Sequence, residues 1–167
     1  MSNTTRDTAL VTGASRGIGR AILERLVEDG LHVVNLDIAT PVALHAHETF
    51  IQVDMADEAA LRAALAQATQ GRAITRLVNN AGIVRPAGID TATSADLQAV
   101  MALNVAASIA CVQAVLPAMR AARFGRIVNI SSRAALGKGE RIAYAASKAA
   151  LHGLTRTLAL ELAADGI

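Results

Sequence analysis

The chain has 167 residues, of which 53% are hydrophobic, and it carries a formal net charge of +2 at pH 7. A chain of this length can form one domain with a substantial core, so residues 1–167 are expected to be a single domain. The lysines and arginines are scattered and are not interleaved with aromatic residues, which argues against nucleic-acid binding.

The sequence shows no sign of export or of membrane insertion. It has no apolar secretory signal at the N-terminus, and no uninterrupted apolar stretch of the roughly 18 residues that a membrane span requires. The single cysteine, Cys111, permits no disulfide within the chain and is expected to be a small core residue. We therefore expect a cytoplasmic protein without a membrane partner.

Short apolar runs alternate with longer segments of helical period. The runs predict buried strands at 8–13, 32–37, 49–54, 74–80 and 125–131. The helical segments lie at 17–29, 57–69, 94–120 and 144–164. The connection from Asp37 to Glu48 is expected to be a loop or a single turn. Such alternation predicts an α/β fold, a doubly wound parallel sheet with helices on both faces.

The helical segments 94–120 and 144–164 are apolar on nearly all sides. A helix of this kind has to be covered on several sides. Because the domain is small, we expect a second subunit to provide part of the cover. The predicted assembly is a homo-oligomer, a dimer or a tetramer, formed through these two helices.

The sequence TGASRGIGRAI at 12–22 follows the first predicted strand and opens the first helix. Gly13 permits a tight turn, Gly17 lets the backbone approach a phosphate, and Gly19 allows the helix to pack on the strand. The helix N-terminus offers unpaired N–H groups and a partial positive charge to a pyrophosphate. The pattern predicts a dinucleotide-binding loop.

Asp37 ends the second predicted strand, where its carboxylate can bind the adenosine ribose. A carboxylate there accepts hydrogen bonds from the ribose hydroxyls and repels a 2′-phosphate. Arg16, beside the glycine loop, could instead pair with a 2′-phosphate. We expect NAD as the cofactor, with NADP as the alternative.

The only tyrosine of the chain, Tyr144, precedes Lys148 by one helical turn in YAASK (144–148). On a helix the two side chains share a face, so the ammonium can stabilise a phenolate that acts as a general base. A structural pair of residues would also satisfy this spacing.

Several motifs occur together and in a fixed order. They are the glycine loop, NNAG at 79–82, LNV at 103–105, ISS at 130–132 and YAASK at 144–148. Their order and approximate spacing resemble the short-chain dehydrogenases/reductases over most of the chain. The resemblance implies a Rossmann-like sheet, a nicotinamide cofactor and hydride transfer between a small secondary alcohol and a ketone. It also implies a C-terminally incomplete member, which lacks the final strands and has a bare edge at the fifth.

The resemblance implies a catalytic set of Asn104, Ser132, Tyr144 and Lys148. In that set Tyr144 is the general acid/base, Lys148 tunes it and holds the nicotinamide ribose, and Ser132 binds the substrate oxygen. The interval from Ser132 to Tyr144 is one residue shorter than usual, so Ser131 is an alternative. Asn104 would hold a water that leads protons away from the lysine; the alternative is a buried amide that stabilises a helix kink.

The cofactor-binding positions come from the loop, the strand ends and the resemblance together. They are Gly13, Ser15, Arg16, Ile18, Gly19, Asp37, Asp54, Met55, Asn80, Ala81, Gly82, Tyr144 and Lys148. For Asp54, a helix-capping role is an equal alternative, and no metal site is expected. The alternative to an oxidoreductase is a catalytically impaired dinucleotide-binding or oligomerisation module, or a fragment.

Overall fold

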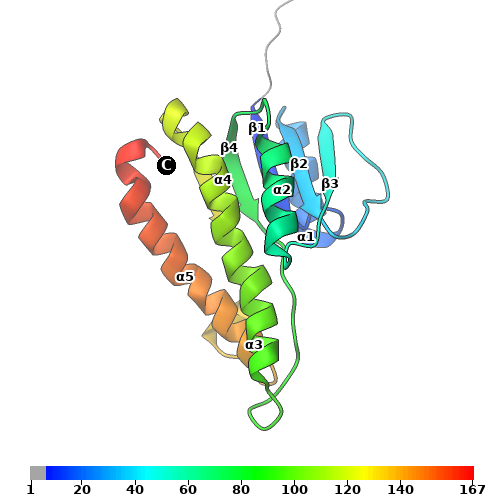
Figure 1. The fold of residues 1–167 in the computed structure, drawn as a ribbon, viewed down its shortest axis with the longest axis vertical. Coiled ribbons are helices and arrows are strands. Elements are labelled where there is room, and N and C mark those ends of the chain that lie inside the picture. Colours follow the sequence, from blue (N-terminus) through cyan, green and yellow to red (C-terminus); the bar gives the residue numbers. More distant parts are fainter. Residues whose placement is uncertain (1–6) are drawn as a thin grey trace, which may run out of the picture.

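The computed structural model describes residues 7–167. Its strands form one sheet in the order β3-β2-β1-β4-β5, and every neighbouring pair is parallel (Figure 1). The strands are β1 (Thr8–Thr12), β2 (His32–Asp37), β3 (Glu48–Gln52), β4 (Ile74–Asn79) and β5 (Arg126–Asn129). This arrangement confirms the predicted doubly wound parallel sheet.

The helices begin and end close to the predicted positions. They are α1 (Gly17–Glu28), α2 (Glu58–Thr69), α3 (Ser94–Met101), α4 (Ala107–Ala122) and α5 (Ile142–Leu162). Asp57 caps α2, because its side chain accepts hydrogen bonds from the amides of Ala59 and Ala60. The connection between β2 and β3 contains neither helix nor strand, as predicted.

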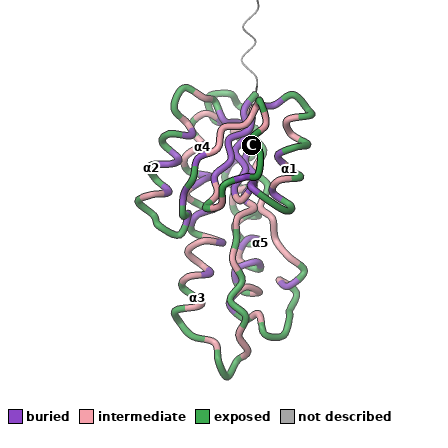
Figure 2. The backbone as a smooth tube through the Cα atoms, turned by 90° about the vertical axis from the view of Figure 1, so that its right-hand side faces the viewer, coloured by how far each residue is buried: buried purple, intermediate pink, exposed green. Residues whose placement is uncertain are grey.

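The side chains of β1, β2 and β4 alternate between two core clusters, one on each face of the sheet. On one face, Leu10, Val34 and Leu77 pack against α2 and α4. On the other face, Val11 and Val33 pack against α1. Figure 2 shows the buried residues concentrated in the sheet and on the helix faces turned toward it. The helices hold the sheet so that all the carboxyl ends of the strands open at one side.

The residues from Ser94 to Ala122 form one continuous helix with a π-helical segment, Ala102–Ala106, between α3 and α4. This helix has 29 residues and a mean hydropathy of 2.0 in its most apolar window, so by length and composition it could cross a membrane. The sequence-based expectation concerned an uninterrupted apolar stretch, and Asn104, Ser108 and Gln113 do interrupt this helix. Its length and mean hydropathy are a separate criterion, which the helix meets. Part of this apolar character belongs to the domain core, where Cys111, Val115 and Met119 are fully buried.

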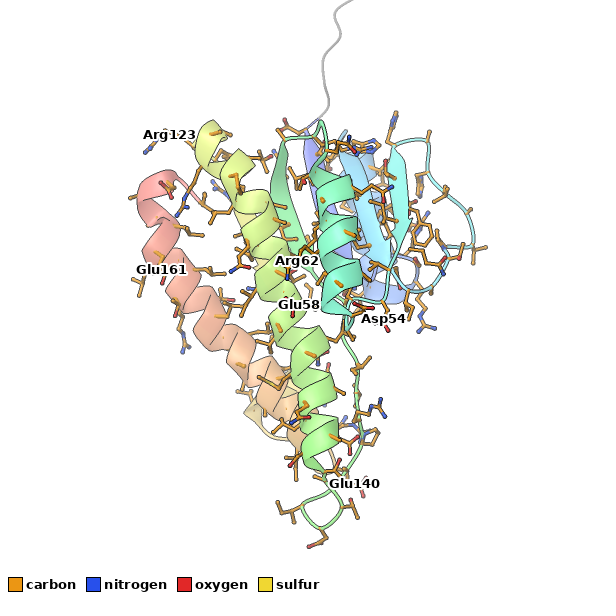
Figure 3. All side chains as sticks on the ribbon, viewed as in Figure 1. Asp54, Glu58, Arg62, Arg123, Glu140 and Glu161 are labelled. Carbon is orange, nitrogen blue, oxygen red and sulfur yellow. The ribbon has the colours of Figure 1, made fainter. Side chains whose placement is uncertain are left out.

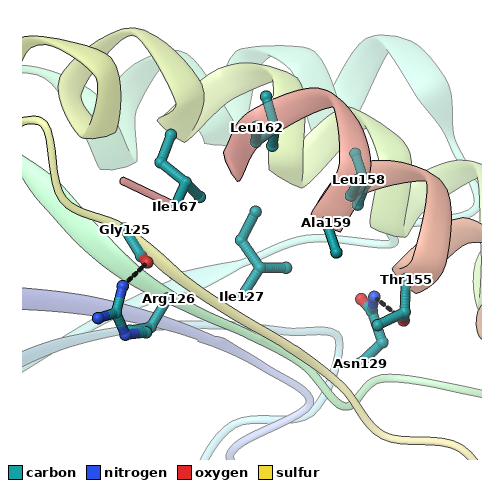
Figure 4. A pocket seen from close by; sticks show the side chains of 9 residues that line it. All are labelled: Gly125, Arg126, Ile127, Asn129, Thr155, Leu158, Ala159, Leu162 and Ile167. Atoms are coloured by element: carbon teal, nitrogen blue, oxygen red, sulfur yellow. Dashed lines mark hydrogen bonds between the residues drawn. The ribbon is translucent and has the colours of Figure 1, made fainter. Parts of the chain in front are cut away.

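β5 forms one edge of the sheet and pairs only with β4. Between its open side and α5 lies an apolar groove of about 160 Å³ (Figure 4). The groove is lined by Gly125, Arg126, Ile127, Asn129, Thr155, Leu158, Ala159, Leu162 and Ile167. The expected bare edge of the fifth strand is thus present in the described residues.

Candidate functional site

A cleft of about 680 Å³ opens at the carboxyl ends of β1 to β4. The sheet order places β1 and β4 side by side although β2 and β3 follow β1 in the chain. Ligands of open α/β sheets bind where the strand order reverses in this way. The cleft is lined by Gly13, Arg16, Gly17, Ile18, Asp37, Ile38, Val53, Asp54, Met55, Ala56, Asn80, Ala81, Gly82, Ile83, Arg85, Ala99 and Leu103.

The glycine loop is packed tightly on one side and open on the other. Gly13 has a φ of +67°, and its amide donates to the Leu36 carbonyl at 2.8 Å. A β carbon on Gly19 would clash with the Gly13 carbonyl oxygen and lie 2.5 Å from Asn80 Nδ2. Gly17 has a φ of +62° and no atom within 4 Å of such a carbon. The loop therefore leaves space in front of α1, as a bound pyrophosphate requires.

Asn80 joins the end of β4 to the glycine loop. Its side-chain amide donates to the carbonyl oxygens of Thr12 and Gly13, both at 3.0 Å. The backbone amides of Asn80 and Ala81 donate to the Thr12 hydroxyl, also at 3.0 Å. These four bonds fix the NNAG stretch against β1, so Ala81 and Gly82 form the adjoining wall of the cleft.

Asp37 lies at the cleft and holds the glycine loop through its carboxylate. One oxygen accepts the Ser15 amide at 2.9 Å, and the other accepts the Ala39 amide at 3.0 Å. The Ser15 hydroxyl donates to the Ala39 carbonyl at 2.5 Å. A carboxylate offers about four acceptor positions, so each oxygen retains capacity for a ribose hydroxyl. Arg16 is exposed and lines the same cleft.

The residues after β3 form the far side of the cleft. Asp54 is exposed and accepts the Ala56 amide at 2.9 Å. It lies near the beginning of α2, beside Glu58 in Figure 3, but the helix cap is Asp57. The structure thus removes the alternative in which Asp54 caps the helix. Met55 is buried, and Ile18 across the cleft is 66% exposed.

Lys148 is buried and does not line the cleft, but it lies close to Gly82 of the cleft wall. Its ammonium donates to the Ile130 carbonyl oxygen at 2.7 Å and lies 5.7 Å from the centre of the Tyr144 ring. A β carbon on Gly82 would come 3.5 Å from the same ammonium. Burial lowers the pKa of Lys148 below its ordinary value. Lys148 therefore lies beside Gly82 of the NNAG stretch, with the Tyr144 ring close to its ammonium.

Asn104 lies in the π-helical segment and is 1% exposed. Its side chain accepts the Ile83 amide at 2.8 Å and donates to the Ile83 carbonyl at 3.1 Å. It also donates to the Ser147 hydroxyl at 3.0 Å, one residue before Lys148. The amide thus ties the loop after β4 to α5, and its position at a helix irregularity agrees with the structural alternative for Asn104.

The two serines after β5 have different environments. The Ser131 hydroxyl donates to the Lys148 backbone carbonyl at 2.9 Å and lies 2.9 Å from His152 Nε2. The Ser132 hydroxyl accepts the Ala134 amide at 3.1 Å, at the start of a 3₁₀ turn from Arg133 to Leu136. The Ser131 hydroxyl therefore donates its proton within the chain, whereas the Ser132 hydroxyl acts as an acceptor through its oxygen.

Nine of the thirteen predicted cofactor positions line the cleft itself. The remaining positions are Ser15, Gly19, Tyr144 and Lys148, and the first two support the loop from behind. Sequence reasoning missed seven lining residues, which are Ile38, Val53, Ala56, Ile83, Arg85, Ala99 and Leu103. Extending the NNAG motif would have found Ile83 and Arg85; Ala99 enters the site only because the helix after β4 crosses the cleft.

In residues 7–167 there is no group of three or more His, Cys, Asp or Glu that could hold a metal ion. The residues of the cleft do fit a dinucleotide, because the loop geometry, the open space at Gly17 and the acid at the end of β2 occur together.

Residues 7–167 match the family model described as short chain dehydrogenase. The oxidoreductase UcpA of Salmonella typhimurium is 37% identical over 179 residues, which cover 100% of this chain and 68% of that protein. The rhamnolipids biosynthesis 3-oxoacyl-[acyl-carrier-protein] reductase of Pseudomonas aeruginosa is 38% identical over 174 residues, which cover 95% of this chain and 68% of that protein. The chain spans about two thirds of the length of these relatives.

Two solved structures have the same fold. A 4-hydroxyisoleucine dehydrogenase complexed with NADH superimposes with a TM-score of 0.88 at 28% identity, covering 96% of this chain and 70% of that one. A 3-oxoacyl (acyl-carrier-protein) reductase from Agrobacterium tumefaciens C58 with NADP bound superimposes with a TM-score of 0.89 at 33% identity. The match covers 98% of this chain and 67% of that one. One of these two structures holds NADH and the other holds NADP. The family match and the similarity to these proteins show that the present chain belongs to the short-chain dehydrogenase/reductase family of oxidoreductases.

Proposed function

We propose that this chain is the cofactor-binding and catalytic part of an oxidoreductase that uses NAD(H) on a small secondary alcohol or the corresponding ketone. The observation that carries the proposal is the buried Lys148 ammonium, which lies 5.7 Å from the centre of the Tyr144 ring and close to Gly82 of the cleft wall. A module that only binds a dinucleotide has no need of this arrangement.

The proposed cofactor site follows the walls of the cleft. The nicotinamide dinucleotide, when bound, accepts or donates the hydride. The amides at the start of α1 and the open space at Gly17 would hold its pyrophosphate. Asp37 would accept the adenosine ribose hydroxyls, Asp54 and Met55 would flank the adenine, and Lys148 would bond the nicotinamide ribose.

The preference for NAD over NADP rests on Asp37. Its carboxylate lines the cleft and would repel a 2′-phosphate, while the exposed Arg16 of the same cleft would attract one. The carboxylate is fixed by two backbone amides, whereas Arg16 is an exposed and rotatable side chain. We infer that Asp37 dominates the selection.

In the proposed chemistry Tyr144 takes the proton of the alcohol in oxidation and returns it in reduction. Lys148 stabilises the phenolate by its charge, which acts strongly because the ammonium is desolvated. Ser132 donates its hydroxyl proton to the substrate oxygen, since the proton of Ser131 is engaged with the Lys148 carbonyl. Asn104 holds the loop and α5 together around the lysine.

Two measurements test the proposal. Fluorescence titration of the 167-residue chain should show saturable binding of NADH and weaker binding of NADPH by about tenfold or more. Oxidation of a panel of small secondary alcohols with NAD⁺ should then be lost in Tyr144→Phe without loss of NADH binding. Equal affinity for the two cofactors would refute the NAD preference. Binding without turnover of any alcohol or ketone would favour the dinucleotide-binding module.

We also propose self-association through α4 and α5. Each helix carries an exposed aliphatic side chain, Ile109 at 38% and Leu160 at 84%. Light scattering of the purified chain should give a dimer or a tetramer, and Leu160→Asp should lower the mass if this face is the interface. A monomeric mass for the unmodified chain would refute the assembly.

A further inference from the structure

Asn35 is a polar residue in the middle of an otherwise apolar strand. It lies in β2, opposite Val11 of β1 and Phe50 of β3, and it is 0% exposed. By strand alternation its side chain is on the same face as Val33, which packs in the cluster beneath α1. A buried amide in such a place is costly unless its hydrogen bonds are made.

The side chain of Asn35 makes three hydrogen bonds, and two of them reach the glycine loop. Its oxygen accepts the Ala14 amide at 3.2 Å, and its nitrogen donates to the Ser15 hydroxyl at 3.3 Å. The nitrogen also donates to a carboxylate oxygen of Glu48 at 3.0 Å. Asn35 therefore joins the loop that follows β1 to the first residue of β3.

Glu48 anchors the other end of this connection. Its side chain is 0% exposed, and its second oxygen accepts Arg20 Nη1 at 2.8 Å and the His45 amide at 3.1 Å. Arg20 also donates to the Ala43 carbonyl at 3.0 Å. The ion pair thus fixes α1, the start of β3 and the connection before it as one unit behind the cleft.

Ser15 connects Asn35 to Asp37 through hydrogen bonds of its hydroxyl and its backbone amide. The Ser15 hydroxyl accepts from Asn35 and donates to the Ala39 carbonyl, while its amide donates to Asp37. The amide of Ala39 donates to the other oxygen of Asp37. Both oxygens of the acid are therefore held by groups that depend on the position of Ser15.

We propose that Asn35 is a positioning residue for cofactor selection. It does not line the cleft, and it acts by fixing Ser15, which orients the Asp37 carboxylate toward the adenosine ribose. The Glu48–Arg20 pair keeps the Asn35 amide in one orientation. This inference rests on the proposed function, because it requires that the Asp37 carboxylate binds the adenosine ribose hydroxyls.

The test compares the Kd values of NADH and NADPH, measured by fluorescence titration, for the unmodified chain, Asn35→Ala, Asp37→Ala and the double variant. Asn35→Ala should weaken NADH by about tenfold, and NADPH by less than about twofold, because a 2′-phosphate gains nothing from Asp37. In the Asp37→Ala background, Asn35→Ala should change the NADH affinity by less than about twofold. The matched control is Thr49→Val. It removes the 2.8 Å hydrogen bond between the Thr49 hydroxyl of β3 and His32 Nε2 of β2, and this bond does not involve the glycine loop or Asp37.

The outcomes separate the inference from the proposed function. Equal losses for both cofactors, or the same loss with and without Asp37, would mean that Asn35 only stabilises the fold and would overturn the inference. An unmodified chain that binds neither cofactor would overturn the proposed function and, with it, this inference. If circular dichroism shows that Asn35→Ala does not fold, Asn35→Ser provides the same comparison, because its side chain is one bond shorter and cannot span the distances to Ala14 and Ser15.

Discussion

The ammonium of Lys148 bonds the carbonyl oxygen of Ile130 at 2.7 Å and so connects the first half of α5 to the end of β5. The lysine is only 4% exposed, and removal from water lowers the pKa of its ammonium. A charge kept in a place that disfavours it lowers the stability of the fold. Such a cost is typical of residues retained for function.

Lys148→Met should therefore abolish turnover while leaving the melting temperature at pH 7 at least as high as before. Because the pKa of Lys148 in the folded chain lies below 10.5, the unfolded chain binds the extra proton in the interval between the two values. The stability of the unmodified chain should rise with pH in that interval, relative to the variant. Melting curves of both proteins from pH 7 to 10.5 test this, and a relative stability that falls with pH would contradict it.

Gly19→Ala should destabilise the domain by about 1–3 kcal/mol, because the new methyl group would overlap the Gly13 carbonyl and approach Asn80. Gly153→Ala is the control, since its β carbon meets nothing within 4 Å and the residue lies inside α5. There alanine should stabilise by about 0.5–1 kcal/mol. Urea unfolding measures both changes, and equal effects would contradict the close packing at Gly19.

Arg20→Met should cost about 3–5 kcal/mol, because it leaves the buried carboxylate of Glu48 without its counter-charge. Arg62→Met is the surface control. The Arg62–Glu58 pair on α2 is 77% and 84% exposed, and its loss should cost about 0.5 kcal/mol or less (Figure 3). Adding Glu48→Gln to Arg20→Met should recover part of the stability in urea unfolding. No recovery would mean that Arg20 acts by packing.

Cys111 should not react with a thiol reagent in the native state at pH 8. Burial against the core raises the pKa of its thiol to about 12, so the reactive thiolate is scarce. Labelling should become rapid in denaturing urea, where the thiol is exposed. Release of the chromophore from an aromatic disulfide reagent follows both reactions, and fast labelling without urea would contradict the burial of this helix.

Ser132→Ala should lower kcat by about a hundredfold with little change in NADH affinity, if its hydroxyl holds the substrate oxygen. Ser131→Ala should instead disturb the α5 backbone at Lys148, and it should lower the melting temperature. Steady-state kinetics and thermal unfolding of the two variants distinguish these roles. Full turnover in Ser132→Ala would assign the substrate oxygen to the other serine.

The fold was largely predictable because its signals are local. The apolar runs and the glycine loop mark β1, α1 and β2, and the helical period predicted α2 within one residue of its observed start. The dinucleotide-binding loop was predictable from the spacing of its glycines after the first strand. The sequence also predicted that Tyr144 and Lys148 share one face of a helix. The distance of 5.7 Å between the Lys148 ammonium and the centre of the Tyr144 ring agrees with this prediction.

The support of the site could not be predicted in the same way. Nothing in the sequence links Asn35 with Glu48 and Arg20, since they come from two strands and a helix that meet only after the sheet forms. The bond from Lys148 to a backbone carbonyl leaves no signal in residue types. The seven missed cleft residues have the same cause, because their side chains are mostly aliphatic and gain a role only from position.

The π-helical segment around Asn104 puts the two ends of a 29-residue helix out of phase with each other. One residue in a regular helix corresponds to a rotation of about 100°. Removing a single residue between Ala102 and Ala106 would thus turn the core stripe of α4 away from β4, or Asn104 away from Ile83. We therefore expect insertion or deletion of one residue in this segment to disturb the site more than a change of side chain does.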